Sequence, residues 1–248
     1  SVEDDSPSAL SPRTDVIPTI NTNLMIVLDI SGSMNTADGV GGTTRLASAI
    51  ASINRLLDKY DEIGEVKVRL VTFSTGSNEV GTTWLTVAQA RTSLSTITAA
   101  GGTNYDAALD MAMTSFATAS GKQTGTGVQN LSYFFSDGDP TYSSGSTSTF
   151  TGTLNGNGSS TTSSTDNGIQ VIEEGIWEDF LKDNQLKSFS IGIGNGIAGI
   201  TPLDPIAYDG AGKRELNGIL VNDLAQLDAV LAGTVASTAS GNLHASGS

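Results

Sequence analysis

The sequence predicts an α/β protein with a doubly wound, mostly parallel central sheet and helices on both of its faces. Two short apolar runs, residues 24–28 and 133–135, lack the polar alternation of a half-exposed strand and are typical of strands buried on both faces. Longer segments with apolar residues at helical spacing lie between the expected strands. Because parallel strands are joined by crossovers that are usually helical and right-handed, this alternation predicts the doubly wound arrangement.

Six strands are expected, at residues 24–28, 65–73, 78–85, 131–137, 186–193 and 218–221. The second alternates apolar residues with Lys67 and Arg69, so it should have one polar face. The third has a weaker pattern and is expected to be an antiparallel edge strand.

Helices are expected at about residues 45–63, 87–97, 104–116, 168–183 and 224–231. Polar residues that can cap them precede four of the five: Thr43 or Thr44, Thr86, Thr103, and Asn222 or Asp223. In the helix at 168–183, Ile172 should lie on the buried face. Glu173, Glu174 and Glu178 should lie off that face as a solvated acidic surface, and not as a glycosidase-like carboxylate pair.

The residues that carry chemistry begin where the first strand ends. Asp29, Ser31 and Ser33 follow the apolar run at alternate positions, and Gly32 allows a tight turn between them. Their oxygen atoms can therefore converge on one point at the carboxyl edge of the sheet, where open α/β sheets bind their ligands. Oxygen ligands suit a hard divalent cation, so a Mg²⁺ or Ca²⁺ ion is the expected occupant.

Two further segments complete a pattern. Residues 101–104 read Gly-Gly-Thr-Asn at the head of a helix, and residues 133–138 form an apolar strand that ends in Ser-Asp-Gly. The set Asp29, Ser31, Ser33, Thr103 and Asp137 resembles the metal-ion-dependent adhesion site of von Willebrand factor A domains. The resemblance covers about residues 21–235, and all five positions of the family pattern are filled.

The resemblance implies a role for each position. The hydroxyls of Ser31, Ser33 and Thr103 would bind the cation directly, Asp29 and Asp137 would act partly through water, and a carboxylate of a ligand protein would fill the open coordination position. Thr103 can serve both as a helix cap and as a ligand of the ion. The rim around the ligand is expected to include further residues, which are Gly102, Asn104, Asp139 and Tyr142.

A structural function is the alternative. Calcium could stiffen a spacer domain that has no ligand of its own, because an ion that binds only the folded state stabilises it. Additional structural Ca²⁺ ions could then bind at the loop carboxylates of Asp139, Asp204 and Asp209, although each of these is more often a turn residue. An accessory role in an enzyme complex, as in chelatase-type A domains, fits the pattern but not the composition.

The composition excludes several classes of function. The chain has 248 residues and a formal net charge of −14, which argues against nucleic acid and anionic membrane surfaces as partners. It has no cysteine, and its single histidine is His244, so thiolate metal sites and His-based triads are not expected. No apolar stretch is long enough to insert into a membrane. We expect a protein that is not an enzyme and is monomeric as an isolated domain.

The chain is expected to be one module of a longer protein. Residues 1–20 should be a linker, 21–236 the A domain, 141–167 a Ser/Thr/Gly-rich insertion beside the metal edge, and 237–248 a tail or second linker. The acidic, cysteine-free, Gly/Ser/Thr-rich composition resembles that of large RTX-type surface adhesins of Gram-negative bacteria. That resemblance implies type I secretion, an extracellular location, attachment or biofilm functions, and contacts with neighbouring domains of the same chain.

One motif argues for a different chemistry and fails in its context. Residues 194–199 match G-x-G-x-x-G after a strand, with Glu215 about 20 residues further on. A dinucleotide site needs a helix that begins inside the motif, but Pro202 and Pro205 interrupt the segment immediately after it. We therefore expect no nucleotide site, and nucleophilic serine chemistry lacks a base.

Overall fold

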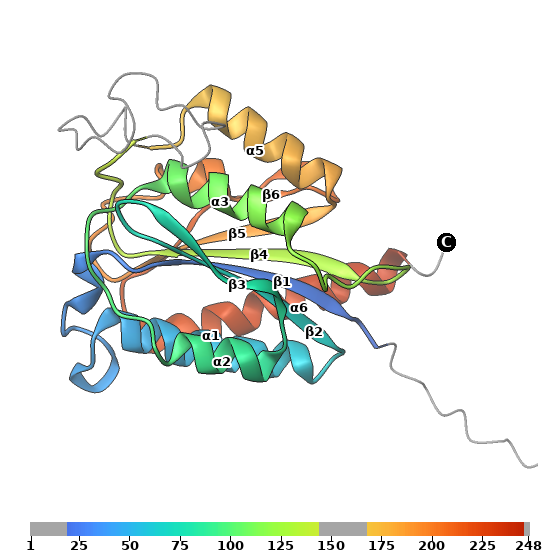
Figure 1. The fold of residues 1–248 in the computed structure, drawn as a ribbon, viewed down its shortest axis with the longest axis horizontal. Coiled ribbons are helices and arrows are strands. Elements are labelled where there is room, and N and C mark those ends of the chain that lie inside the picture. The colour runs from blue at the N-terminus through green and yellow to red at the C-terminus, as the bar shows by residue number, and fades with distance from the viewer. Residues whose placement is uncertain (1–18, 144–167, 246–248) are drawn as a thin grey trace, which may run out of the picture.

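The computed structural model describes residues 19–143 and 168–245. Residues 1–18, 144–167 and 246–248 lie outside the described residues, and with them most of the predicted linker and insertion. The described part forms one central sheet that is covered by helices on both faces, as the sequence predicts (Figure 1).

Within the described ranges the sheet has eight strands, which are β1 (Thr22–Asp29), β2 (Val66–Phe73), β3 (Ser77–Leu85), β4 (Gln129–Ser136), β5 (Leu186–Ile193), β6 (Tyr208–Asp209), β7 (Arg214–Glu215) and β8 (Ile219–Val221). Their order is β3-β2-β1-β4-β5-β6-β7, and β8 pairs with β5. Strands β1, β2, β4, β5 and β8 are parallel, and β3 is the expected antiparallel edge strand. The sequence did not predict β6 and β7, because two-residue strands are too short to show a period.

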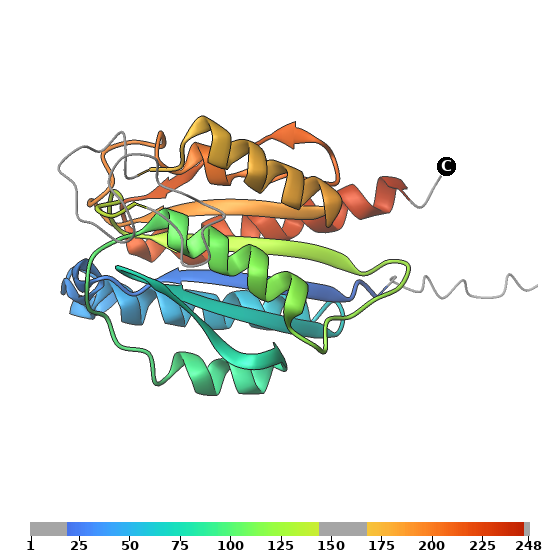
Figure 2. The same cartoon turned by 45° about the horizontal axis from the view of Figure 1, so that its top comes forward.

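The described helices are α1 (Arg45–Asp61), α2 (Val87–Leu94), α3 (Tyr105–Thr118), α5 (Val171–Asp183) and α6 (Leu227–Ala245), with short 3₁₀ helices η1 (Gly32–Asn35), η2 (Val40–Gly42), η3 (Asp204–Ile206) and η4 (Leu224–Gln226). Helices α3 and α5 lie side by side on one face of the sheet, and α1, α2 and α6 cover the other (Figures 1 and 2). Helix α6 runs past residue 237, where a tail was expected. In the part of the chain that the structure describes, no helix has both the length and the apolar character needed to cross a bilayer.

The predicted caps start the first two helices. The Thr44 hydroxyl accepts a hydrogen bond of 3.1 Å from the backbone N–H of Ala47. Thr86 and Gln89 form a capping box at the start of α2. Each cap satisfies an N–H group that has no partner inside its helix, which fixes where the helix begins.

Strand β1 lies at the centre of the sheet and is buried along its whole length. Leu24, Ile26 and Leu28 pack into the core under α1, α2 and α6. Met25 and Val27 point to the opposite core, under α3 and α5. Burial on both faces is the physical reason that residues 24–28 form an unbroken apolar run.

The predicted polar face of β2 is wrong at Arg69, whose side chain is fully buried. The Nη1 atom of Arg69 donates hydrogen bonds of 3.0 Å to the carbonyl oxygens of Gly81 and Thr83, and the guanidinium pairs with Glu79. These groups belong to β3, whose register with β2 shifts between Val68 and Leu70. The irregular edge strand therefore supplies acceptors for the Nη1 and Nη2 atoms of the buried guanidinium.

The predicted buried face of α5 is also wrong in its first turn. Ile172 is 73% exposed, whereas Glu173 is 4% exposed. The carboxylate of Glu173 accepts a hydrogen bond of 2.8 Å from the backbone N–H of Gln170. Capping of the helix start thus fixes the orientation of this turn against the apolar pattern.

Candidate metal centre

The candidate centre lies at the carboxyl ends of β1 and β4, on the left of Figure 1. Asp29 is the last residue of β1 and is fully buried. Its Oδ1 atom accepts a hydrogen bond of 2.7 Å from the backbone N–H of Ser31. The chain then turns into η1, which carries Ser33. This turn brings the alternate oxygen-bearing side chains to one side of the strand end, as the spacing predicts.

Side-chain hydrogen bonds join the two strand ends. The Oγ atoms of Ser31 and Ser33 are 3.0 Å apart. Ser33 Oγ donates a hydrogen bond of 2.6 Å to Oδ1 of Asp137, the residue that follows β4. Because β1 and β4 are adjacent and parallel, with Leu28 beside Phe135, both carboxylates reach the same edge of the sheet. The structure thus brings Asp29, Ser31, Ser33 and Asp137 together.

Thr103 lies in the loop that packs against this edge. The backbone N–H of Gly32 donates a hydrogen bond of 2.9 Å to the carbonyl of Gly101. Thr103 is 5% exposed, and its backbone N–H donates to the Thr141 hydroxyl at 3.0 Å. Among the described residues, no hydrogen bond engages the Thr103 hydroxyl, so that oxygen is free to bind a ligand.

The cap of α3 is Asn104, so the capping role expected of Thr103 is wrong. Asn104 Oδ1 accepts a hydrogen bond of 3.0 Å from the backbone N–H of Ala107. Its Nδ2 atom donates to the carbonyl of Thr75 at 3.1 Å. Asn104 is only 1% exposed, so its buried side chain holds the loop that carries Thr103 in place. Thr103 is therefore not needed to cap α3.

The other predicted rim residues lie at the surface of this edge. Asp139 is exposed, and Tyr142 and Gly102 are half-buried. A Cβ atom at Gly102 would lie 2.3 Å from the ring of Tyr142, so the ring packs directly on the glycine backbone. Their role as a ligand rim stays a prediction.

The electrostatics of the site follow from its burial. Burial raises the pKa of Asp29 to about 7, against the lowering effect of hydrogen bonds from Ser136 and Ser31, and the nearby charge of Asp137 adds to the rise. An ionised Asp29 therefore lacks a sufficient positive partner. A divalent cation would supply that charge. The five predicted ligand side chains all offer oxygen atoms, so the residues present fit a hard cation such as Mg²⁺ or Ca²⁺.

Comparison with known proteins agrees with this fold. Residues 24–139 match the family model of the von Willebrand factor type A domain. The fold is that of a von Willebrand factor type A domain. No curated protein sequence matches the chain.

Solved structures with this fold include three that are similar over most of the chain. The D319A mutant of the PilB minor pilin from Streptococcus sanguinis is 18% identical, with a TM-score of 0.65 over 93% of this chain and 64% of that one. Proximal thread matrix protein 1 from the mussel byssus, with a zinc-occupied MIDAS motif, is 15% identical, with a TM-score of 0.59 over 89% and 46%. The pilus adhesin SpaC from Lactobacillus rhamnosus GG is 17% identical, with a TM-score of 0.57 over 91% and 31%. The chain thus spans less than two thirds of each of these proteins.

Sequence reasoning missed one residue of the candidate centre. Arg45, the first residue of α1, donates from Nη1 to Oδ2 of Asp137 at 2.9 Å. Its Nε and Nη2 atoms donate to the two carboxylate oxygens of Asp38, at 2.8 Å and 2.7 Å. One signal was available, because Arg45 is the only basic residue between positions 14 and 54.

The G-x-G-x-x-G segment, residues 194–199, packs against this ion pair. No helix begins inside residues 194–199, as expected. A Cβ atom at Gly194 would lie 2.9 Å from Nε of Arg45, and one at Gly196 would lie 2.0 Å from the carbonyl oxygen of Asp137. The glycines therefore allow a close approach of two backbones beside the metal edge.

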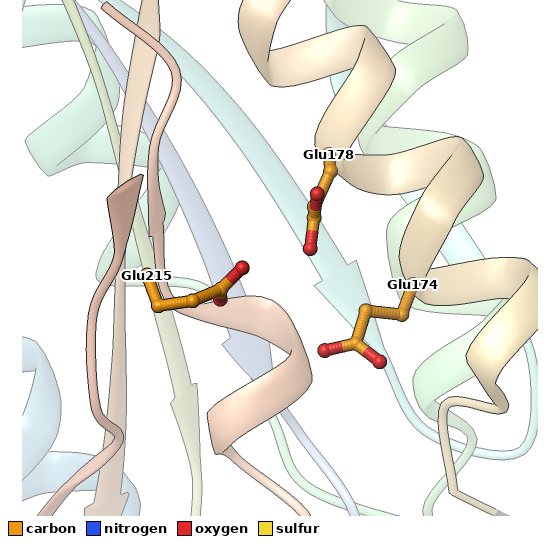
Figure 3. Close-up of side chains that lie close together, drawn as sticks. All are labelled: Glu174, Glu178 and Glu215. Carbon is orange, nitrogen blue, oxygen red and sulfur yellow. The ribbon is translucent and has the colours of Figure 1, made fainter. Parts of the chain in front are cut away.

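A second group of carboxylates lies between α5 and β7 (Figure 3). The side-chain oxygens of Glu174, Glu178 and Glu215 lie within 4.8 Å of one another. Burial first, and then the charge of Glu178, raises the pKa of Glu215. Lys182 Nζ pairs with Glu178 at 2.8 Å, so part of this negative charge is already neutralised.

Two of the three carboxylates that are candidate calcium ligands have structural partners. Asp204 accepts a hydrogen bond of 2.8 Å from the backbone N–H of Gly218. Asp209 accepts one of 2.9 Å from Gly212 N–H and pairs with Arg214 at 3.2 Å. Both act as turn residues in this fold.

Proposed function

We propose that this A domain is a divalent-cation-dependent adhesion module that binds an acidic group of a ligand protein. The observation that supports the proposal most is the convergence of Asp29, Ser31, Ser33 and Asp137 at one sheet edge, with the unengaged hydroxyl of Thr103 in the adjoining loop. A bound Mg²⁺ or Ca²⁺ ion would supply an open coordination position for a carboxylate.

The five residues of the site would contribute two kinds of oxygen ligand. Ser31, Ser33 and Thr103 would offer neutral oxygens, and Asp29 and Asp137 would offer negative charge, partly through water. Three neutral donors among five leave the loaded site able to attract another anion. The proposal assigns the domain no catalysis.

We also propose a place for the domain in the cell. The acidic, cysteine-free composition supports an extracellular module of an RTX-type adhesin that a Gram-negative bacterium exports by type I secretion, with neighbouring domains of the same chain as permanent partners. The similarity to a minor pilin and a pilus adhesin supports a surface location with an adhesive or biofilm function.

The test is a calorimetric titration of Mg²⁺, and separately Ca²⁺, into chelator-treated protein. Wild type should bind one ion that Asp29→Ala does not bind. Asp61→Ala, an exposed carboxylate at the far end of α1, should bind as wild type does. Identical titrations of wild type and Asp29→Ala would exclude the proposed site.

A second measurement separates adhesion from the spacer function. Acetate, as a probe of carboxylate binding, is titrated into Mn²⁺-loaded protein, and the water proton relaxation rate is followed. The rate should fall as acetate displaces metal-bound water. If the ion binds and stabilises the domain but acetate never changes the relaxation rate, the spacer function is correct.

A further inference from the structure

The position of Arg45 is unfavourable for helix α1 itself. It is the first residue after the Thr44 cap, where the positive end of the helix dipole disfavours a cation. The side chain is nevertheless ordered by three hydrogen bonds and is only 10% exposed. Interactions outside the helix must therefore explain a buried arginine at this position.

The guanidinium of Arg45 binds only one of the two carboxylate oxygens of Asp137. Oδ2 accepts from Arg45 Nη1 at 2.9 Å, whereas Oδ1 accepts from Ser33 Oγ at 2.6 Å. Only Oδ1 is thus turned toward the hydroxyl cluster. Because Asp137 is fully buried, Oδ2 is shielded from bulk solvent. Asp137 can therefore offer only one oxygen, Oδ1, to an ion bound beside the hydroxyls of Ser31 and Ser33.

The loop after β5 shields this pair from solvent. The backbone at Gly194 lies against the Arg45 guanidinium, and the backbone at Gly196 lies against Asp137, at distances that leave no room for a Cβ atom. A charge pair in such a place interacts more strongly than one in water. The outer partner of Arg45, Asp38, has a side chain that is 41% exposed, so water screens its charge.

The balance of charge then favours an anionic ligand. The two carboxylates of the site carry formal charges that would cancel a divalent ion. Arg45 adds one positive charge behind Asp137, and its other partner, Asp38, offsets this charge only in part because solvent screens the Asp38 side chain. We infer that Arg45 is a positioning residue of the centre, which limits Asp137 to one oxygen and keeps the loaded site electrophilic. This inference rests on the proposed function.

The inference predicts opposite effects on two affinities. Arg45→Gln keeps a hydrogen-bond donor but removes the charge, so Mg²⁺ should bind at least threefold more tightly, because its repulsion by the guanidinium is lost. Acetate should bind the Mn²⁺-loaded variant at least threefold more weakly. A purely structural role would weaken both.

Two further variants complete the experiment, which uses the calorimetric and relaxation measurements above. Arg45→Lys keeps the charge and should return both affinities toward wild type. Arg55→Gln, on an exposed face of the same helix, should change neither. One outcome is that wild type binds both the ion and acetate while Arg45→Gln has the same two affinities, or a lower affinity for each. That outcome refutes the role of Arg45 and leaves the proposed function standing. If wild type binds neither ion, the proposed function fails and this role fails with it.

Discussion

Ser136 holds Asp29 across the two strands that form the candidate centre. The Ser136 hydroxyl, at the end of β4, donates a hydrogen bond of 2.6 Å to Oδ2 of Asp29, at the end of β1. Both side chains are fully buried. Asp29 Oδ1 is held separately by the backbone of Ser31. Both oxygens of this carboxylate are therefore oriented before any ion arrives, and such orientation is the usual contribution of partners beyond the direct ligands of a metal.

Replacing Ser136 should weaken the site without removing a ligand. Ser136→Ala removes the bond to Asp29 and should reduce the affinity for Mg²⁺ about tenfold, in the lower part of the usual range for such partners. Calorimetric titration at pH 8 measures this, since Asp29 is ionised there. Ser132→Ala is the matched control: it lies on the same strand, is buried, and has a hydroxyl with no partner among the described residues. Equal loss of affinity in both variants would contradict the role of Ser136.

The pKa of Asp29 makes stability depend on pH in a defined direction. Burial raises it to about 7 from an ordinary 3.8, so the folded state binds the proton more tightly than the unfolded state. The stabilising contribution of the protonated form is complete below about pH 4 and is lost as the pH rises through about 7. Without metal, the free energy of unfolding of wild type should fall relative to Asp29→Asn by roughly 2–4 kcal/mol between pH 4 and pH 8.

Chemical denaturation in chelator at several pH values measures that difference. Adding Mg²⁺ at pH 8 should restore stability to wild type only, because the ion favours the ionised carboxylate. Ion uptake at pH 6 should release a proton, visible as a dependence of the calorimetric heat on the buffer. Parallel pH profiles for wild type and variant would show that Asp29 is not the group responsible.

The glycine motif after β5 should matter for packing and not for nucleotides. Gly196→Ala places a Cβ atom 2.0 Å from the carbonyl oxygen of Asp137, so the loop or the strand end must move. The expected cost is about 1–3 kcal/mol of unfolding free energy, together with weaker Mg²⁺ binding. Gly199→Ala, in the same motif, has nothing within 4 Å of the new atom and should be nearly neutral. Denaturant unfolding compares the two, and equal stabilities would refute the packing role.

The sequence by itself determined the architecture, because periodicity and apolar runs report burial directly. Residues 24–28 are apolar without interruption since β1 is buried on both faces, and that pattern predicted a buried parallel strand. The spacing of Asp29, Ser31 and Ser33 also predicted that their oxygens converge, because alternate positions before and after a tight turn can face the same side of the strand end.

Only the tertiary structure decided which polar side chains are buried, because burial of a charge depends on partners that are remote in sequence. Arg69 is buried because carbonyl groups of β3 accept hydrogen bonds from it. Glu173 is buried because its carboxylate accepts a hydrogen bond from the backbone at the start of α5. Arg45 meets Asp137 across 92 positions of the chain, and Ser136 meets Asp29 across 107. No local pattern encodes such pairs, since they exist only once parallel strand ends and the first turn of α1 share one edge of the sheet.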